Sequence, residues 1–280
     1  MILDMHIVGA MGMRRSVVLL MLMLAGWPLM ALAGSDPDRG MTRALGIEEP
    51  WIETAVYLTS SRDNITSAGH TWNANVEWDL AFNRHWGAEI DGPGLLAAEP
   101  LGKGSTALAP LTFGLKYSPL QWGSDDTDDA GIVSLEAEGS WWPHPRPDAF
   151  PATGSNLSGQ LLVAYRHGSH WFQGEYGLSK RLAVDARSGW FANSAIGQKL
   201  SDTWNVQLEV DVNHVSVADN GATAMGLALT PQVGAHIGRN WLVIVGESYA
   251  RIAGQSGYTA TTNVLLEYGF DHDEDNPDGS

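Results

Sequence analysis

The chain has 280 residues, with 16 Lys and Arg against 32 Asp and Glu, and a formal net charge of −16. Nucleic acid is therefore a poor partner, because binding to phosphate groups requires cationic side chains. The absence of cysteine excludes a disulfide framework, a thiolate metal site and a cysteine nucleophile.

The N-terminal residues have the pattern of an export signal. Arg14 and Arg15 precede the apolar stretch SVVLLMLMLAGWPLM, and the small-residue site ALAG follows, so we expect cleavage after Ala33. A transmembrane anchor is the alternative, but polar residues follow the cleavage site at once. We predict a signal peptide over residues 1–33, export by a Gram-negative bacterium, and a periplasmic N-terminal segment over residues 34–50.

From residue 51 to residue 270, apolar and polar residues alternate as they do in strands with two different faces. In WNVQLEVDVNHV (204–215), Leu208 and Val210 point to one side and Glu209 to the other. No apolar run after the signal approaches the ~20 residues of a membrane helix. The pattern predicts an all-β fold, an antiparallel transmembrane β-barrel of about twelve strands over 51–270, with an acidic C-terminal tail over 271–280. The predicted strands are 51–60, 70–82, 86–98, 106–118, 131–142, 158–167, 170–181, 188–199, 204–215, 222–237, 241–252 and 258–270.

Four short polar turns, NRHW, GSHW, SDTW and GRNW, each end in tryptophan and all fall at one end of the predicted sheet. Tryptophan prefers the membrane–water interface, so this pattern favours a membrane barrel; tryptophans in a soluble core are the alternative. Trp171 shares the phase of Gln173 and Glu175, so strict alternation turns it inward unless a bulge intervenes. The predicted interface girdle is Phe82, Trp86, Tyr117, Tyr165, Trp171, Trp204, Trp241 and Phe270.

If the aliphatic face meets lipid, the polar face lines a lumen. Two interpretations stay open: a charged constriction that selects small polar or cationic solutes, or a network of ion pairs and hydrogen bonds that fills a narrow barrel. The predicted lumen-lining residues are Asn75, Glu77, Asp79, Glu89, Lys116, Glu136, Glu138, Arg166, Glu175, Glu209, Asp211 and Glu267.

Enzymatic and metal-binding patterns are weak. The histidines are scattered, and the acidic runs have no EF-hand spacing. A catalytic set of Ser216, His214 and Asn193 would lack a nucleophile elbow or a glycine-flanked serine. We expect no enzyme, no cofactor and no metal site.

The stretch LTFGLKYSPLQW…GIVSLEAEGSWWP (111–143) and the closing NVLLEYGF resemble the proteobacterial outer-membrane family associated with phenol meta-pathway genes, often described as transporters. The shared pattern is a Gly-x-Lys-Tyr strand, here Gly114, Lys116 and Tyr117, followed by a polar turn and a strand ending at Pro143. This resemblance implies a twelve-strand outer-membrane barrel that passes small organic compounds. The chain departs from the pattern in PHPRPDAFPATG and in the ten acidic-tail residues after Phe270.

The expected function is passive passage of small solutes through an acid-lined lumen in the outer membrane. The alternatives are a structural or adhesion barrel with a blocked lumen, and a soluble periplasmic β-domain that binds a ligand; a lipid-embedded enzyme comes last. The expected partners are outer-membrane lipid, small-molecule solutes and the barrel-assembly machinery during biogenesis.

Overall fold

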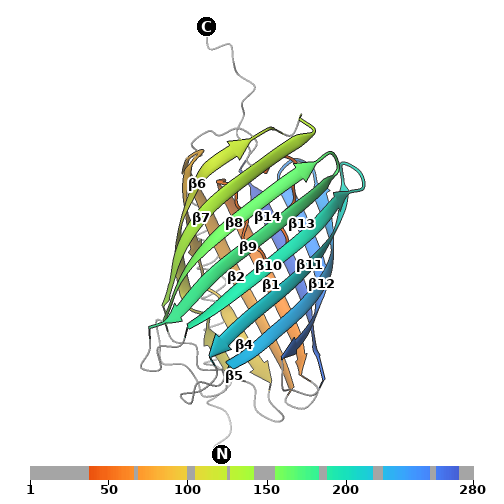
Figure 1. Ribbon diagram of the computed structural model, residues 1–280. Helices are drawn as coiled ribbons and strands as arrows, with labels where there is room; N and C mark the ends of the chain where they lie inside the picture. Colours follow the sequence, from red (N-terminus) through yellow and green to blue (C-terminus); the bar gives the residue numbers. More distant parts are fainter. Residues whose placement is uncertain are drawn as a thin grey trace, which may run out of the picture. The chain divides into compact units, whose positions relative to one another are not determined.

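The computed structural model describes residues 38–65, 69–99, 105–124, 127–141, 155–182, 188–216, 223–252 and 257–270. Within these ranges the regular elements are all β-strands (Figure 1). The same ranges hold no apolar helix of membrane-spanning length. The predicted signal peptide (1–33) and acidic tail (271–280) lie outside the described residues.

The strands form one antiparallel sheet that closes on itself, because β1 pairs with both β14 and β2. Among the fourteen described strands, β3 and β4 pair with different parts of β2 and share one position around the barrel, and β5 and β6 share the next. Twelve strand positions result, which confirms the predicted fold and strand number. The strands are β1 (Ala55–Ile65), β2 (Gly69–Asn83), β3 (Trp86–Asp91), β4 (Leu95–Glu99), β5 (Ser105–Leu108), β6 (Leu111–Trp122), β7 (Asp129–Trp141), β8 (Asn156–His167), β9 (His170–Arg181), β10 (Ser188–Lys199), β11 (Trp204–Ser216), β12 (Thr223–Ile237), β13 (Trp241–Ile252) and β14 (Thr259–Gly269).

Proline divides two of the strand positions. Pro93 separates β3 from β4, and Pro110 separates β5 from β6. Neither proline has an N–H group to donate to the sheet, and Gly92 beside Pro93 has a φ of 108°, which favours glycine. The predicted strands 86–98 and 106–118 are therefore each interrupted.

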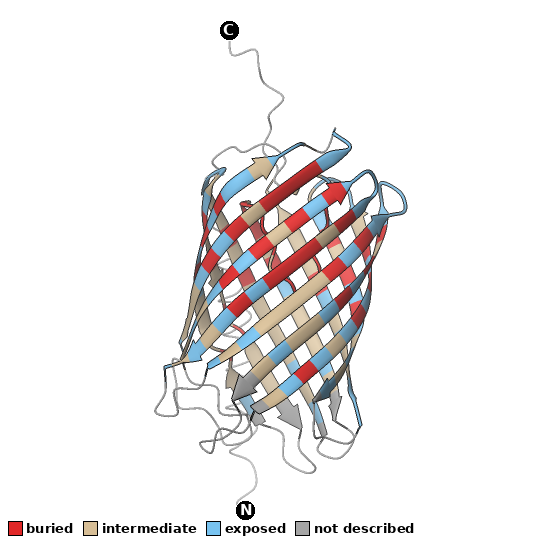
Figure 2. Cartoon of the chain, viewed as in Figure 1, coloured by how far each residue is buried: buried red, intermediate tan, exposed pale blue. Residues whose placement is uncertain are grey.

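The apolar face of the strands is on the outside of the barrel. Along the strands buried and exposed residues alternate (Figure 2). In β11, Leu208 and Val210 are 39% and 37% exposed, whereas Glu209 between them is 1% exposed on the inside. A soluble β-sandwich would bury the aliphatic side chains and expose the carboxylate. The arrangement seen here is instead that of a membrane barrel.

An irregular segment, residues 38–54, lies inside the barrel; we call it the inner loop. It begins at the end of the barrel that carries the short turns after β2, β8, β10 and β12 (the turn end), where the guanidinium of Arg39 donates to the carbonyl of Gly123. It also ends there, where the Phe270 N–H donates to the Thr54 carbonyl at 3.1 Å. Between these points Ile47 and Glu49 are almost fully buried.

The inner loop changes two boundaries expected from the sequence. The first barrel strand starts at Ala55 and not at residue 51, because Trp51 is 3% exposed and packs against Ile132 of the barrel wall. The segment expected to be periplasmic (34–50) is described from Asp38 onward, and this part lies inside the barrel. An irregular chain in this position must find hydrogen-bond partners on the wall.

Candidate functional site

The predicted lumen-lining residues lie on the inner face of the barrel. Residues paired across neighbouring strands share a face, and the inner face is the one that contacts the inner loop. Eight of these side chains are buried: Glu77, Asp79, Glu89, Lys116, Glu136, Arg166, Glu175 and Glu209. Four are partly buried: Asn75, Glu138, Asp211 and Glu267.

Arg43 of the inner loop joins the loop to the wall. Its guanidinium forms ion pairs with Glu77 of β2, with Glu48 at 3.2 Å and with Glu49 at 3.0 Å. It also lies over the ring of Tyr57 of β1, 4.4 Å from the ring centre. All of these side chains are shielded from solvent, so removing either charge of a pair leaves the other buried and uncompensated.

Lys116 of β6 makes the second bridge between wall and loop. Its Nζ lies 2.8 Å from Glu48 Oε1 and 2.8 Å from Glu49 Oε1, and 3.9 Å from Asp79 Oδ2. Glu48 and Glu49 thus bind a cation of the loop and a cation of the wall together. Strand alternation predicts Lys116 on the inner face but does not indicate its partners in the inner loop.

Wall side chains also satisfy the backbone of the inner loop. Gln173 Oε1 accepts from the Ala44 N–H at 3.0 Å, and Gln173 Nε2 donates to the Thr42 carbonyl at 2.6 Å. Gln207 Nε2 donates to the Arg43 carbonyl at 2.8 Å. Three further backbone N–H groups donate to the wall, from Leu45 to Gln232, from Gly46 to Glu209 and from Glu48 to Glu175. These contacts replace the hydrogen bonds that the loop would make to water.

Gly46 of the inner loop lies directly against the Glu209 side chain of the wall. A Cβ atom at this position would overlap the Glu209 carboxylate. Only glycine therefore allows the Gly46 N–H to reach Glu209 Oε2, at 3.1 Å, without moving the acid.

Arg166 fixes the inner loop at the turn end. Its Nε donates to the Arg39 carbonyl at 2.7 Å, and its other nitrogens donate to the carbonyls of Ser124, Thr127 and Gly168. Arg166 is 7% exposed. It holds the loop entrance and the turns around it together.

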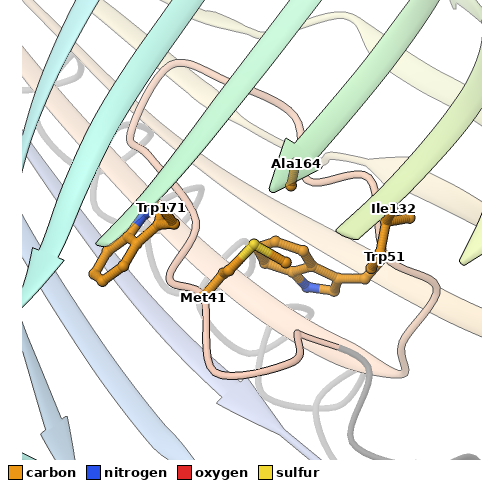
Figure 3. Close-up of a cluster of buried hydrophobic side chains, with 5 residues drawn as sticks. All are labelled: Met41, Trp51, Ile132, Ala164 and Trp171. Carbon is orange, nitrogen blue, oxygen red and sulfur yellow. The ribbon is translucent and has the colours of Figure 1, made fainter. Parts of the chain in front are cut away.

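Trp171 lies inside the barrel, which corrects its assignment to the girdle. It is 4% exposed and packs in a cluster with Met41 and Trp51 of the inner loop and Ile132 and Ala164 of the wall (Figure 3). Strict strand alternation holds at this position without a bulge. The indole occupies the space that a side chain at residue 197 would need, and residue 197 is glycine.

The other predicted girdle residues lie near the turn end, and those exposed on the outer surface are Phe82, Trp86, Tyr117, Tyr165, Trp204 and Trp241. Trp86 stacks on Tyr117 with ring centres 4.4 Å apart. Phe270 is partly buried and packs edge-on against Tyr268, with ring centres 5.1 Å apart.

A second set of exposed aromatic residues lies near the opposite end of the barrel and was not predicted from the sequence: Trp72, Trp141, Trp190 and Tyr258. These four residues lie near the ends of the predicted strands that are opposite the turn end. That position could have indicated a second aromatic girdle.

The inner-loop residues are the largest omission of the sequence analysis. Arg43, Glu48 and Glu49 stand in TRALGIEEPW, which has no strand periodicity. Glu53 is also missing: it accepts hydrogen bonds from Trp51 Nε1 at 2.6 Å and from the Tyr57 hydroxyl at 2.5 Å. Burial and the neighbouring Glu49 charge raise the pKa of Glu53 to about 7. The predicted inner face has more acidic than basic side chains. This excess was the available sign that a cationic side chain from outside the strands, here Arg43, would pair with the wall.

No protein-family model and no curated protein matches the chain. Among solved structures, the COG4313 outer membrane channel from Pseudomonas putida F1 is similar with a TM-score of 0.60 at 9% identity, covering 82% of this chain and 100% of that one. The chain has the fold of an outer-membrane β-barrel. The KdgM porin in complex with disordered oligogalacturonate gives a TM-score of 0.44 at 8% identity, covering 78% of this chain and 99% of the porin. LpxR from Salmonella typhimurium also gives 0.44 at 8% identity, covering 78% and 100%.

Proposed function

We propose that the protein is an outer-membrane channel for small solutes, closed by its own inner loop (residues 38–54). Passage opens when this loop leaves the barrel interior. The observation that carries the proposal is the loop itself, which fills the lumen through polar contacts to the wall and has both of its ends at the turn end.

The nature of the loop–wall contacts supports movement. The contacts of Arg43, Gly46 and Lys116 are ion pairs and hydrogen bonds, which water and solute can replace when the loop withdraws. Because the loop enters and leaves at the same end, it can move out without passing through the barrel. The Met41–Trp171 cluster opposes this movement, so the closed state is expected to dominate in the absence of a signal.

The inner face determines which solutes pass. When the inner loop withdraws, Arg43 leaves with it, whereas Glu77, Glu136 and Glu209 stay on the wall. A lumen with this excess of carboxylates favours cationic and neutral polar solutes over anions. The similarity to the phenol meta-pathway family stays a prediction, and with it passage of small organic compounds.

The outer surface supports a place in the outer membrane. Exposed aliphatic residues cover the strands between two sets of exposed aromatic residues, the arrangement that lipid and its two interfaces require. Export through the signal peptide and insertion by the barrel-assembly machinery are part of the proposal.

Removal of the inner loop tests this function. The mature chain and a variant lacking residues 38–50 are inserted into planar bilayers, and a gel-mobility shift on boiling confirms that both are folded. We expect the deletion variant to conduct continuously and to favour cations, and the wild type to open rarely. A folded deletion variant that does not conduct would exclude the channel.

A structural barrel with a blocked lumen is the second candidate. The buried network of Arg43, Lys116 and their carboxylates favours it, because such a network can serve to fill and hold a narrow barrel. A non-conducting but folded deletion variant is the result that this alternative predicts.

The geometry does not favour an enzyme. Register pairing places His214 opposite Trp190, and the two rings stack with centres 5.6 Å apart. Asn193 lies an odd number of residues from Trp190 and donates to Glu175 on the inner face. His214 and Asn193 therefore lie on opposite faces of the sheet and do not form a catalytic set.

A further inference from the structure

Two wall carboxylates share a site that the ion-pair network does not neutralise. Glu89 of β3 pairs with Gly114 of β6, Glu136 of β7 pairs with Lys116 two residues along β6, and both carboxyl side chains are 4% exposed. Glu89 Oε2 and Glu136 Oε1 have no hydrogen-bond partner within the described part of the chain. A Cβ atom on Gly114 would lie 2.8 Å from Glu136 Oε1 and 3.3 Å from Glu89 Oε2, so both oxygens face the space above this glycine.

The inner loop adds a third carboxylate. One oxygen each from Glu48, Glu89 and Glu136 lie within 4.8 Å of one another. Oxygens that bind a common Ca²⁺ at about 2.4 Å are at most about 4.8 Å apart, and the spacing of these three meets that upper limit. Glu48 also contacts Lys116 and Arg43, but a carboxylate oxygen has two lone pairs and can serve both partners.

The charges around this site are unbalanced. Within the described ranges, the ion pairs of Arg43 and Lys116 are with Glu48, Glu49, Glu77 and Asp79. Glu89 and Glu136 have no ion pair there. Burying carboxylates without a counter-charge is costly, and buried charges are normally paired or bind metal ions.

We propose that Glu48, Glu89 and Glu136 bind a divalent cation, with Ca²⁺ as the ion that these ligands favour. The ligands are all carboxylate oxygens, which suit a hard cation, and they come from three separate chain segments that can adapt to the flexible geometry of Ca²⁺. Water completes the coordination. The site is distinct from the Arg43–Lys116 network, although Glu48 belongs to both.

The bound ion would tie the inner loop to the wall at β3 and β7. This consequence rests on the function proposed above, whereas binding itself does not. Loss of the ion would then favour withdrawal of the loop, because Glu48 would lose one of its contacts with the wall.

Calcium titration of the full mature chain tests the proposal. The protein is folded in detergent and freed of metal with a chelator, and CaCl₂ is titrated by calorimetry. We expect one Ca²⁺ per chain, with the Kd increased about tenfold or more in Glu89→Gln and in Glu136→Gln. The matched control is Glu138→Gln, on the same strand and face as Glu136, whose oxygens already accept from Ser158 and Gln160; its Kd is expected to stay within about twofold of the wild-type value.

Folding of each variant is checked by the mobility shift on boiling. Should the wall variants fail to fold, Glu48→Gln removes a ligand from the inner loop and leaves the strands intact, and weaker binding is expected there too. Absence of Ca²⁺ binding to the wild type, or equal weakening by Glu138→Gln, would overturn the proposal. Calorimetry measures Ca²⁺ binding without any measurement of conductance. Failure of the channel to open would therefore not affect the test of Ca²⁺ binding.

Discussion

The guanidinium of Arg43, on the inner loop, forms an ion pair with the carboxylate of Glu77, on wall strand β2, and both side chains are more than nine-tenths buried. This pair connects a segment without regular structure to the barrel. Removal of the Arg43 guanidinium should therefore weaken the attachment of the inner loop to the wall.

Arg43→Ala should loosen the inner loop. The substitution leaves Glu77 without its cation and takes from Glu49 one of its two cations, the other being Lys116. Breaking a buried pair in this way costs about 3–5 kcal/mol. We expect a large rise in open probability in planar bilayers and faster proteolysis within residues 38–54. Arg62→Ala is the control, because Arg62 is exposed on β1, and it should leave both measurements unchanged. Equal behaviour of the two variants would contradict the assigned role of Arg43.

Gly46→Ala should disturb the same contact from the loop side. The new methyl group overlaps the Glu209 carboxylate, which must move and release the Gly46 N–H. The expected cost is about 1–3 kcal/mol, the penalty for a buried N–H without a partner. It is measured as increased hydrogen exchange of the loop amides. Gly139→Ala is the control, since the nearest atom to its new Cβ is Leu157 Cδ1 at 3.9 Å; unchanged loop exchange in Gly46→Ala would contradict the account.

Tryptophan fluorescence separates the inside of the barrel from its surface. Quenchers attached to lipid chains should reach Trp204, which is 52% exposed, but not Trp171, which is 4% exposed. Trp204→Phe should therefore reduce the quenched fraction, and Trp171→Phe should increase it. Trp171→Ala should also destabilise the barrel by about 3–5 kcal/mol, as a cavity in a packed core does. A decrease in the quenched fraction in Trp171→Phe would show that this indole faces lipid, as in the predicted girdle, and would contradict its position inside the barrel.

The inner loop should be held more tightly at acidic than at alkaline pH. The pKa of Glu53 is raised by burial to about 7 from an ordinary 4.5, so docking favours its protonated form. This contribution is fully present below about pH 4.5 and is lost as the pH rises through about 7. The titratable groups that act on the Glu53 carboxyl are Glu49, Glu267, Lys116 and Tyr57, and the Trp51 indole also donates a hydrogen bond to it.

Tryptic cleavage after Arg43, followed between about pH 5 and about pH 8, measures this effect. Cleavage should accelerate with pH beyond the response of trypsin itself, and Glu53→Gln should reduce the change. Glu247→Gln, which alters an exposed carboxylate of β13, should keep it. A wild-type loop whose accessibility is independent of pH would refute this assignment.

The barrel is predictable from the sequence because its signal is local. Alternation such as that of Leu208 and Glu209 determines the face of every residue in the strand, and hairpin register carries this from strand to strand. Alternation did not predict the interruptions at Pro93 and Pro110. Each of these prolines divides a segment that was predicted as one continuous strand. Trp171 shows that phase is a better guide than residue type: its alternation indicates the inside, and its indole alone suggested the interface.

The inner loop is not predictable in the same way. Residues 38–54 have no period, and their partners, such as Gln173 and Gln207, are more than a hundred residues away in the chain. The inner-face acids were found from alternation, but their counter-ion Arg43 comes from a segment that local patterns cannot place.

A reversible crosslink tests most directly whether this loop closes the lumen. Ala44 of the loop and Ala195 of β10 pack in one buried cluster, and the chain has no cysteine of its own, so Ala44→Cys with Ala195→Cys creates a single disulfide. In planar bilayers, the oxidised variant should stay closed, and addition of reductant should restore the openings of the wild type. Equal conductance in the oxidised and reduced states would contradict closure by the inner loop.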